Sequence, residues 1–502
     1  MVGLKASSPR LLSLALLLVA CGGTQDPAPA GAASGGSGGS AGSGPTGGNG
    51  AAPSGEAPTW HADIAPLVAE RCAGCHQEGG IAPFSLQTYE QAKMWSPTFD
   101  APLRAGSMPP FLARETDDCQ PRFGFKDDPR LTAEQIELFK RWDDAGCPEG
   151  DPAAAAPVPE PADLNLAEAD LEVKIPAPVT IEGTGDKFIC FSLAPDFTPL
   201  KSTGPEAALL GERVLIDGAQ VHPGNAGIVH HVLVYTDAEG KSAELAGEKG
   251  YYDCFGGPQL DSPGLLMAWA PGATPVTAPE GVAMALPSTG RIVMQVHYHP
   301  SGSPQVDDAT SVQLRRYRAG IPEYIGTLTL IGNARGPFAN GMGLQAGPGD
   351  AGQPEFRIPA GAEAHTETMS FPLPRAQADY KLWAVGSHMH YVGTDMRIGI
   401  TRAAPAEEPA EECLLDTPHW DFNWQRGYLY DVPIADAPSA KGGDVFNLRC
   451  TYDNSMNNPF VQSALSEQGL SAPRDVRLGE ETLDEMCLGI FGIAQKVSDL
   501  LK

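Results

Sequence analysis

Three short stretches of the sequence hold six of its 11 histidines, each beside aliphatic or aromatic residues. The stretches are IVHHVLVY (228–235), MQVHYHP (294–300) and SHMHYVG (387–393). Alternate residues of a β-strand face the same side, so His388 and His390 can reach one metal ion. His230 and His231 are adjacent and would face opposite sides, so they can share an ion only at a strand end or a bulge. His297 would complete a group of three.

Imidazole binds both zinc and copper, and three histidines alone also fit a catalytic zinc site. A lone histidine on a strand is usually a hydrogen-bonded core residue, and we interpret His222, His365 and His419 in that way. We expect His299 to face solvent rather than to act as a fourth ligand, because the turn-forming residues PSGSP follow it.

A second metal-binding motif, CAGCH, lies early in the chain. Two cysteines at this spacing can form two thioethers to a haem and place His76 as an axial iron ligand, although a zinc or redox CxxC motif is the alternative. Met108 lies before two prolines that stiffen its loop, and a Met/His pair is the cytochrome c arrangement. Met94 is the alternative sixth ligand, but YEQAKMWSP around it predicts a helix. The expected haem-binding residues are Cys72, Cys75, His76 and Met108.

The N-terminal residues predict export. Residues 1–20 carry a basic flank and a ten-residue apolar run that is too short to span a bilayer, as in a signal peptide. LVAC (18–21) resembles a bacterial lipobox, which implies lipid attachment to Cys21, and Gly22 after it implies the outer membrane. A secretory signal with a chance cysteine is the alternative. Residues 21–58 are rich in Gly, Ser and Pro and predict a flexible linker.

Composition and patterning divide the rest of the 502-residue chain. The net charge of −28 without a basic patch excludes nucleic acid as a partner. Residues 59–150 end in an amphipathic helix with Thr132 as N-cap and Gln135 at the capping-box position. A Pro/Ala-rich break at 151–163 follows. Beyond it, short runs rich in Val, Ile, Thr and Tyr alternate with Gly/Pro breaks. We therefore expect a small all-α domain followed by all-β sandwiches.

The motifs VHHVLVY, QVHY, HMHYVG and TLDEMCLGIF occur in this order within about 180–492. They resemble the copper type II, ascorbate-dependent monooxygenases, the family of peptidylglycine hydroxylase and dopamine β-monooxygenase. The resemblance implies two antiparallel β-sandwich domains, at 163–316 and 317–502, each with one copper, and an open cleft between the coppers. Residues 59–150 resemble a small bacterial c-type cytochrome domain. The resemblance implies a first copper on His230, His231 and His297, and a second copper, which activates dioxygen, on His388, His390 and Met486.

The sulfur residues bear on the choice of metal and on the compartment. A thioether ligand is soft and selects Cu(I), so Met486 favours copper over zinc. Ten cysteines fit an oxidising compartment. The resemblance implies the disulfides Cys190–Cys254 and Cys450–Cys487, the second of which would hold Met486 in place. We expect Cys119 and Cys147 to close the haem-binding domain, which leaves Cys413 without a partner.

The chain also departs from that family. Peptide-amidating members hold a substrate carboxylate with an arginine, an asparagine and a tyrosine, at positions that are Gly386, Leu488 and Ile490 here. A neutral or apolar substrate therefore fits better than a peptide C-terminus. The aromatic residues of WDFNWQRGY (420–428) could line its pocket or pack in the core.

Together these features predict a lipid-anchored copper-dependent monooxygenase with two copper ions and one covalent haem. We expect it to hydroxylate a C–H bond of a small substrate with O2, with electrons supplied through the fused haem by an external donor. The alternative is a non-enzymatic haem/copper electron-transfer or copper-binding lipoprotein.

Overall fold

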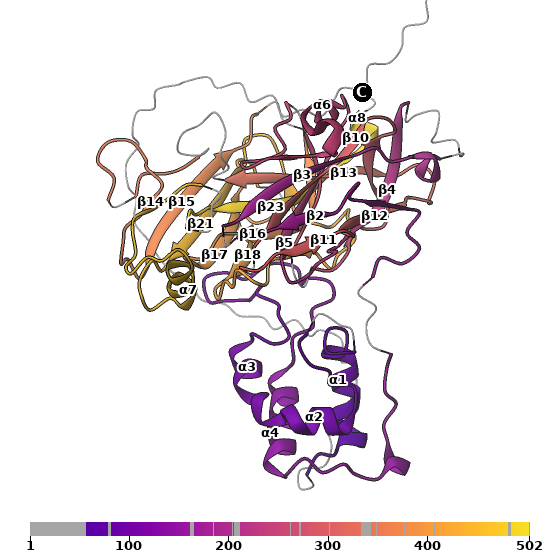
Figure 1. Cartoon of the computed structure of the whole chain (residues 1–502), viewed down its shortest axis with the longest axis vertical. Helices are drawn as coiled ribbons and strands as arrows, with labels where there is room; N and C mark the ends of the chain where they lie inside the picture. Colours follow the sequence, from indigo (N-terminus) through magenta and orange to yellow (C-terminus); the bar gives the residue numbers. More distant parts are fainter. Residues whose placement is uncertain are drawn as a thin grey trace, which may run out of the picture.

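The helices near the N-terminus gather on one side of several layers of β-sheet in the computed structural model of the chain (Figure 1). The described residues are 57–500 without 79–81, 161–164, 184, 203, 205–210, 262, 271–272, 301, 333–342, 348, 376–377, 406 and 480–482. The signal peptide, the lipidation of Cys21 and nearly all of the linker at 21–58 lie outside the described residues. Within the described part, no helix has the length and apolar character needed to cross a membrane.

The helices near the N-terminus pack around one small core. They are η1 (Trp60–Ile64), α1 (Ala65–Arg71), α2 (Tyr89–Trp95), η2 (Ser96–Thr98), α3 (Asp100–Ala105), α4 (Ala133–Asp144) and η3 (Pro152–Ala154). The predicted capping box of α4 is confirmed: Thr132 Oγ1 accepts the N–H of Gln135 at 3.2 Å, and Gln135 Oε1 accepts the N–H of Thr132 at 2.9 Å. Buried Phe139 and Trp142 of α4 face the same core as Trp60.

The largest sheet has ten strands and extends through the whole β region. Its strands, in spatial order, are β1 (Leu171–Lys174), β12 (Ser311–Arg316), β4 (Arg213–His222), β9 (Val282–Pro287), β13 (Tyr324–Gly332), β23 (Leu488–Lys496), β16 (Tyr380–His388) and β19 (Gly427–Leu429), with β8 (Val276–Thr277) beside β4 and β20 (Ser439–Ala440) beside β16. The strands β9 and β13 pair in parallel, with Val282 opposite Tyr324. This pairing joins the two halves of the β region into one sheet.

A separate sheet covers each half of the large one. The five-stranded sheet consists of β6 (Tyr251–Asp253), β3 (Lys187–Leu193), β10 (Arg291–Tyr298), β5 (Val229–Asp237) and β7 (Gly264–Trp269), and shares a core with β4, β9 and β12. The four-stranded sheet consists of β15 (His365–Pro372), β21 (Val445–Tyr452), β17 (Gly393–Thr401) and β18 (Glu411–Thr417), and shares a core with β16 and β23. We call these halves the first and second sandwich.

The remaining elements are short. Two-stranded sheets pair β2 (Val179–Ile181) with β11 (Gln305–Asp307) and β14 (Arg357–Ile358) with β22 (Val476–Arg477), and the helices are η4 (Thr198–Leu200), α6 (Lys241–Ala246), η5 (Gly247–Lys249), α7 (Pro459–Glu467) and α8 (Val497–Leu500). Strand β21 alternates buried and half-buried residues along its whole length, as a strand with one face on the core must. The prediction of a mostly β protein with few helices is confirmed.

Residues 111–130, which we call the strap, leave the helices and pack on the second sandwich. The backbone of the strap is bonded to it at both ends: Arg114 N–H donates to the carbonyl of Asp416 at 2.9 Å, and Lys126 N–H donates to the carbonyl of Leu429 at 2.8 Å. Phe111 and Phe125 of the strap are buried in the core of the second sandwich. The interval 59–150 is therefore not one continuous helical unit, because its middle belongs structurally to the β region.

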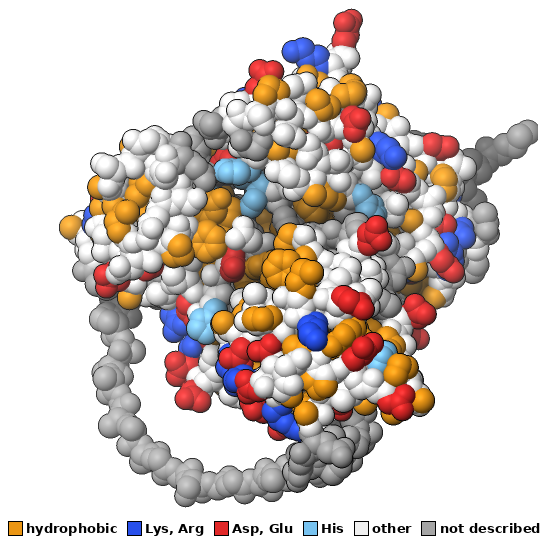
Figure 2. Space-filling model, turned by 60° about the horizontal axis from the view of Figure 1, so that its bottom comes forward, with side chains coloured by type: hydrophobic (Ala, Val, Ile, Leu, Met, Phe, Trp, Pro, Cys, Tyr) orange, Lys and Arg blue, Asp and Glu red, His pale blue; other side chains and the backbone are white. Residues whose placement is uncertain are grey.

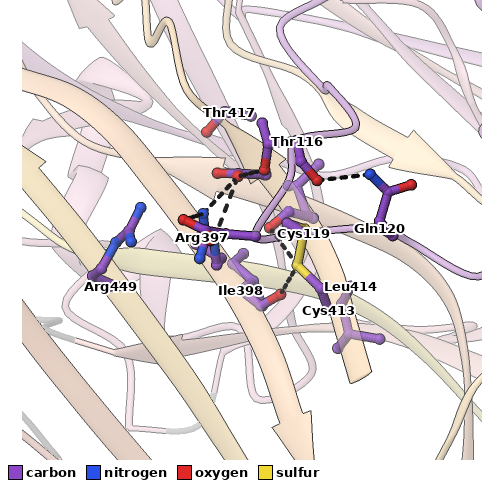
Figure 3. Close-up of a disulfide and its surroundings, with 12 residues drawn as sticks. Thr116, Cys119, Gln120, Arg397, Ile398, Cys413, Leu414, Thr417 and Arg449 are labelled. Atoms are coloured by element: carbon purple, nitrogen blue, oxygen red, sulfur yellow. Dashed lines mark hydrogen bonds and ion pairs between the residues drawn. A yellow bond between two sulfur atoms is a disulfide. The ribbon is translucent and has the colours of Figure 1, made fainter. Parts of the chain in front are cut away.

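The disulfides correct one expected pairing and confirm two. Cys119 of the strap is bonded to Cys413 of β18, with a Cα–Cα distance of 5.4 Å (Figure 3). The expected Cys119–Cys147 bond is wrong, because the strap carries Cys119 away from the helices. Cys147 stays there as a buried thiol, 3.1 Å from the hydroxyl of Ser96. The predicted pairs Cys190–Cys254 and Cys450–Cys487 are both formed.

Candidate metal centres

A β-bulge brings the first three histidines together. In the pairing of β10 with β5, His297 lies opposite His231, but the next residue, Tyr298, lies opposite Val229. His230 is thus the extra residue of a bulge, which turns its side chain toward its neighbour's. The Nδ1 atom of His231 lies 3.2 Å from Nδ1 of His230 and 3.2 Å from Nδ1 of His297. One ligand atom from each histidine lies within 4.8 Å of the others, which suits a single metal ion.

An acidic residue that the sequence did not single out supports this group. The carboxylate of Asp186 lies 3.5 Å from Nε2 of His297 and 2.8 Å from Nδ1 of His299. A carboxylate behind a ligand imidazole orients the ring and makes it a stronger ligand. His299 is partly exposed, as its side chain is 34% accessible, and it contacts Asp186 but is not a member of the group of three.

The lowered pKa values of His230 and His231 keep these two side chains neutral, which is the form that binds a metal. Burial lowers the pKa of His230 and of His231 well below the ordinary value, and the positive charge that His297 would carry lowers both further. Because only neutral imidazole has a free electron pair for a metal, these side chains are ready to bind at neutral pH.

These shifts predict how the stability of the copper-free protein depends on pH. The unfolded chain protonates His230 and His231 near the ordinary pKa of 6.5, whereas the folded chain keeps them neutral. The unfolded state then binds more protons, so stability is complete above 6.5 and is lost as the pH falls below it. We expect each histidine to cost up to about 1.4 kcal/mol per pH unit in that range.

Urea denaturation at about pH 7.5 and about pH 5.5 measures this loss. Replacing His231 by phenylalanine should reduce it, and replacing the exposed His419 by glutamine should leave it unchanged. Equal losses in all three proteins would contradict the assignment to the buried histidines.

The second pair of histidines lies where β16 ends. His388 is opposite Leu488 of β23, and His390 follows two residues later. Nδ1 of His388 lies 2.6 Å from Oε1 of Gln425, and Nδ1 of His390 lies 3.0 Å from the carbonyl oxygen of Asp484. These acceptors fix the tautomer of both rings, so the Nε2 atoms are the ones that can bind a metal.

Met486 lies beside this pair and is held by several contacts. Because His388 is opposite Leu488, the antiparallel register brings Met486 alongside His390. The buried carboxylate of Glu485 accepts the N–H of His390 and the N–H of Met486, both at 2.7 Å. It also accepts two N–H groups from residues 392–393. The carbonyl of Met486 accepts the hydroxyl of Tyr452 at 3.0 Å. The side chain of Met486 is 7% exposed.

The two histidine groups adjoin each other. The ring centroids of His231 and His388 are 6.4 Å apart. Phe422 of the second sandwich stacks on His230 at 4.4 Å and lies 6.2 Å from the ring of His390. The expectation of an open cleft between the two sites is therefore wrong for this structure. Figure 2 shows histidine side chains next to hydrophobic ones on the face of the β region that adjoins the helices.

The CAGCH motif lies at the end of α1 with its thiols unpaired. Cys72 and Cys75 form no disulfide, and burial, followed by the neighbouring Cys75, raises the pKa of Cys72 to about 12. Nδ1 of His76 lies 3.1 Å from the carbonyl oxygen of Phe84, which leaves Nε2 as the atom for an axial bond.

The two candidate methionines differ in their surroundings. Met94 is 71% exposed on α2, whereas Met108 packs on the helical core together with Cys72 and Phe84. This placement favours Met108 as the sixth haem ligand.

We expect Met108→Ala to remove the weak charge-transfer band near the red end of the spectrum of the oxidised haem, because that band reports a thioether bond to iron. Met94→Ala is the matched control and should keep the band. Survival of the band in Met108→Ala would assign the bond to another ligand.

Sequence reasoning did not identify Asp186, Gln425 or Glu485 as site residues. Gln425 lies in the aromatic stretch WDFNWQRGY, and Glu485 lies directly before Met486, so only proximity to other motifs could have suggested them. Of the histidines interpreted as structural core residues, His365 donates from Nε2 to a carboxylate oxygen of Glu367 at 2.7 Å on β15, and His222 ends β4. The interpretation is wrong for His419, which is exposed.

Neither a family model nor a curated protein matches the chain. Solved structures with similarity to it include broad bean stain virus, at 10% identity and a TM-score of 0.24, covering 65% of this chain and 88% of that one. Others are Sulfolobus turreted icosahedral virus, at 9% identity, a TM-score of 0.16 and coverages of 59% and 96%, and the infectious bursal disease virus VP2 subviral particle, at 9% identity, a TM-score of 0.11 and coverages of 69% and 85%. Similarities at these TM-scores carry no argument about function.

Proposed function

We propose that this chain is a copper-dependent monooxygenase that hydroxylates a C–H bond of a small substrate with O2. One observation carries the proposal: two differently built histidine groups lie side by side, with the rings of His231 and His388 6.4 Å apart. The first group turns Nδ1 atoms toward one point, whereas the second has its Nδ1 atoms engaged. Copper storage would not need two adjacent sites of different construction.

The ligands of the two sites divide by type. The first copper would be held by His230, His231 and His297, and the second by His388, His390 and Met486. The thioether of Met486 favours Cu(I) at the second site and distinguishes it from a zinc site. When bound, copper supplies one-electron and dioxygen chemistry.

The residues around the second site orient its ligands and select the substrate. Gln425 fixes the ring of His388, and Glu485 ties the backbone of His390 to that of Met486. Gly386 and Ile490 lie opposite each other beside this site and offer no cation for a substrate carboxylate. A neutral or apolar substrate is therefore the class that we propose.

The helical segment would act as a c-type cytochrome domain. Cys72 and Cys75 would attach the haem, and His76 and Met108 would be its axial ligands. A haem supplies single electrons, and an external donor would replenish them. The N-terminal motif at Cys21 supports an exported lipoprotein that is anchored to the cell envelope through its lipid, at the outer membrane.

The test is oxygen consumption by the chemically reduced, haem- and copper-loaded chain in the presence of candidate apolar substrates. We expect consumption of one O2 for two electrons, and its loss to background in His388→Ala, with His299→Ala retaining it as control. A chain that binds both cofactors and passes electrons without consuming O2 would instead be the non-enzymatic electron-transfer lipoprotein.

A further inference from the structure

A cavity of about 260 Å³ lies where the strap and the two sandwiches meet. Its wall includes Phe111 and Asp127 of the strap, Thr274 and Glu280 of the first sandwich, and Arg426 of the second. Lys126 lines it as well. The cavity is distinct from both histidine groups, none of whose members lines it.

Arg426 is a partly exposed cation in this wall. Its guanidinium lies over the rings of Phe111 and Tyr428, at 5.2 and 5.9 Å from their centroids. The only hydrogen bond of its side chain among the described residues is a long one of 3.4 Å to Thr274, and its buried Nε has no partner. It forms no ion pair with a described carboxylate, although Asp127 and Glu280 line the same cavity. Because the buried Nε has no partner and no described carboxylate forms an ion pair with the guanidinium, an anion bound in the cavity would be favourable.

Arg130 provides the internal comparison. Its guanidinium lies over the same Phe111 ring, also at 5.2 Å, but it forms ion pairs with Glu115 at 3.0 Å and with Asp128 at 2.5 Å. An arginine that stacks on Phe111 can therefore also form ion pairs, so stacking does not explain why Arg426 forms none with the described carboxylates.

The residue before the CAGCH motif contacts a neighbour of the cavity wall. Arg71, directly before Cys72, donates from Nη1 to the carbonyl of Asp128 at 2.9 Å, and Asp128 follows the cavity residue Asp127. Arg426 lies over the ring of Phe111, which follows Met108 in the chain. Met108, the expected sixth haem ligand, lies a few residues before Phe111, which lines the cavity.

A haem carries two carboxylates, and no cation of the helical segment has been assigned to either. We propose that Arg426 binds a carboxylate of the haem attached at Cys72 and Cys75, so that the second sandwich completes the haem site. This inference rests on the haem part of the proposed function and not on its oxygen chemistry. Gln425, the residue before Arg426, is bonded to His388 at 2.6 Å, so two consecutive residues would connect the haem carboxylate with a copper ligand.

The midpoint potential of the haem in the copper-free, full-length protein tests the proposal without any turnover. Arg426→Gln would remove the positive charge beside the haem carboxylate. The negative charge of the carboxylate would then stabilise ferric over ferrous iron. We expect a lower potential in Arg426→Gln, recovery in Arg426→Lys, and no change in the control Arg130→Gln. An unchanged potential in Arg426→Gln, with haem attached, would overturn the proposal and leave the proposed function standing.

Arg426 could bind a free carboxylate ligand instead of a carboxylate of the haem. Calorimetric titration of the haem-loaded chain with benzoate distinguishes these two ligands. We expect no binding that depends on Arg426, because the haem already fills the site. Benzoate binding that is lost in Arg426→Gln would overturn the proposal and assign the cavity to a carboxylate ligand. Failure of the purified chain to carry any haem would overturn both this inference and the haem part of the proposed function.

Discussion

Replacing His231 by alanine is expected to lower the copper that each chain retains from about two ions to about one. The Nδ1 atom of His231 lies 3.2 Å from the Nδ1 atoms of both His230 and His297, so it is the central member of the first group. Its removal leaves His230 on the bulge and His297 on β10, whereas the ligands proposed for the second site lie at the ends of β16 and β23. Metal analysis after copper reconstitution and dialysis measures the loss.

His299→Ala is the matched control for this experiment. His299 lies on the same chain segment as His297 and contacts the same Asp186, but it is not part of the group of three. We expect this variant to keep both ions. Tighter binding of zinc than of Cu(I) at both sites would contradict the monooxygenase proposal, since zinc carries no electrons.

Replacing both Cys119 and Cys413 by serine should strongly destabilise the chain. The bond joins residues 294 positions apart, and the entropy of closing so long a loop in the unfolded chain is worth roughly 5 kcal/mol. Without it, the strap is held to the second sandwich by its hydrogen bonds, by buried Phe111 and Phe125, and by the ion pair of Arg122 with Glu412 at 2.9 Å. Urea denaturation of the oxidised proteins measures the difference.

Cys147→Ser separates the two possible partners of Cys119. In the structure Cys147 is a free thiol, so its replacement should leave the Cys119–Cys413 bond intact and change stability little. The denatured variant should therefore show no newly reactive thiol at Cys119 in peptide mapping. Labelling of Cys119 in this variant would show that Cys119 is normally bonded to Cys147, which would contradict the structure.

The histidine groups could be predicted from the sequence because they depend on the geometry of neighbouring residues in a strand. The spacing of His388 and His390 follows from the two-residue repeat of a strand, and adjacent His230 and His231 required a bulge, which the register of β5 and β10 contains. The capping box of α4 could be predicted for the same reason, since Thr132 and Gln135 are one helical turn apart.

The long-range features were not accessible. The partner of Cys119 depends on the path of the strap, and nothing local distinguishes Cys413 from the nearer Cys147. Gln425 and Asp186 reach the histidines from segments far away in the sequence, so only the folded chain places them there. The adjacency of the two sites likewise depends on the sheet that β9 and β13 make continuous.

The Cys119–Cys413 bond also constrains how the protein is made. A chain that is synthesised from its N-terminal end presents Cys119 and Cys147 long before Cys413. Either Cys119 stays reduced until β18 has emerged, or an early pair with Cys147 has to be exchanged afterwards by attack of a free thiolate. In the second case the native bond depends on thiol–disulfide exchange, and oxidation in order of appearance alone would yield a chain in which Cys119 is bonded to Cys147 and no disulfide links the strap to the second sandwich.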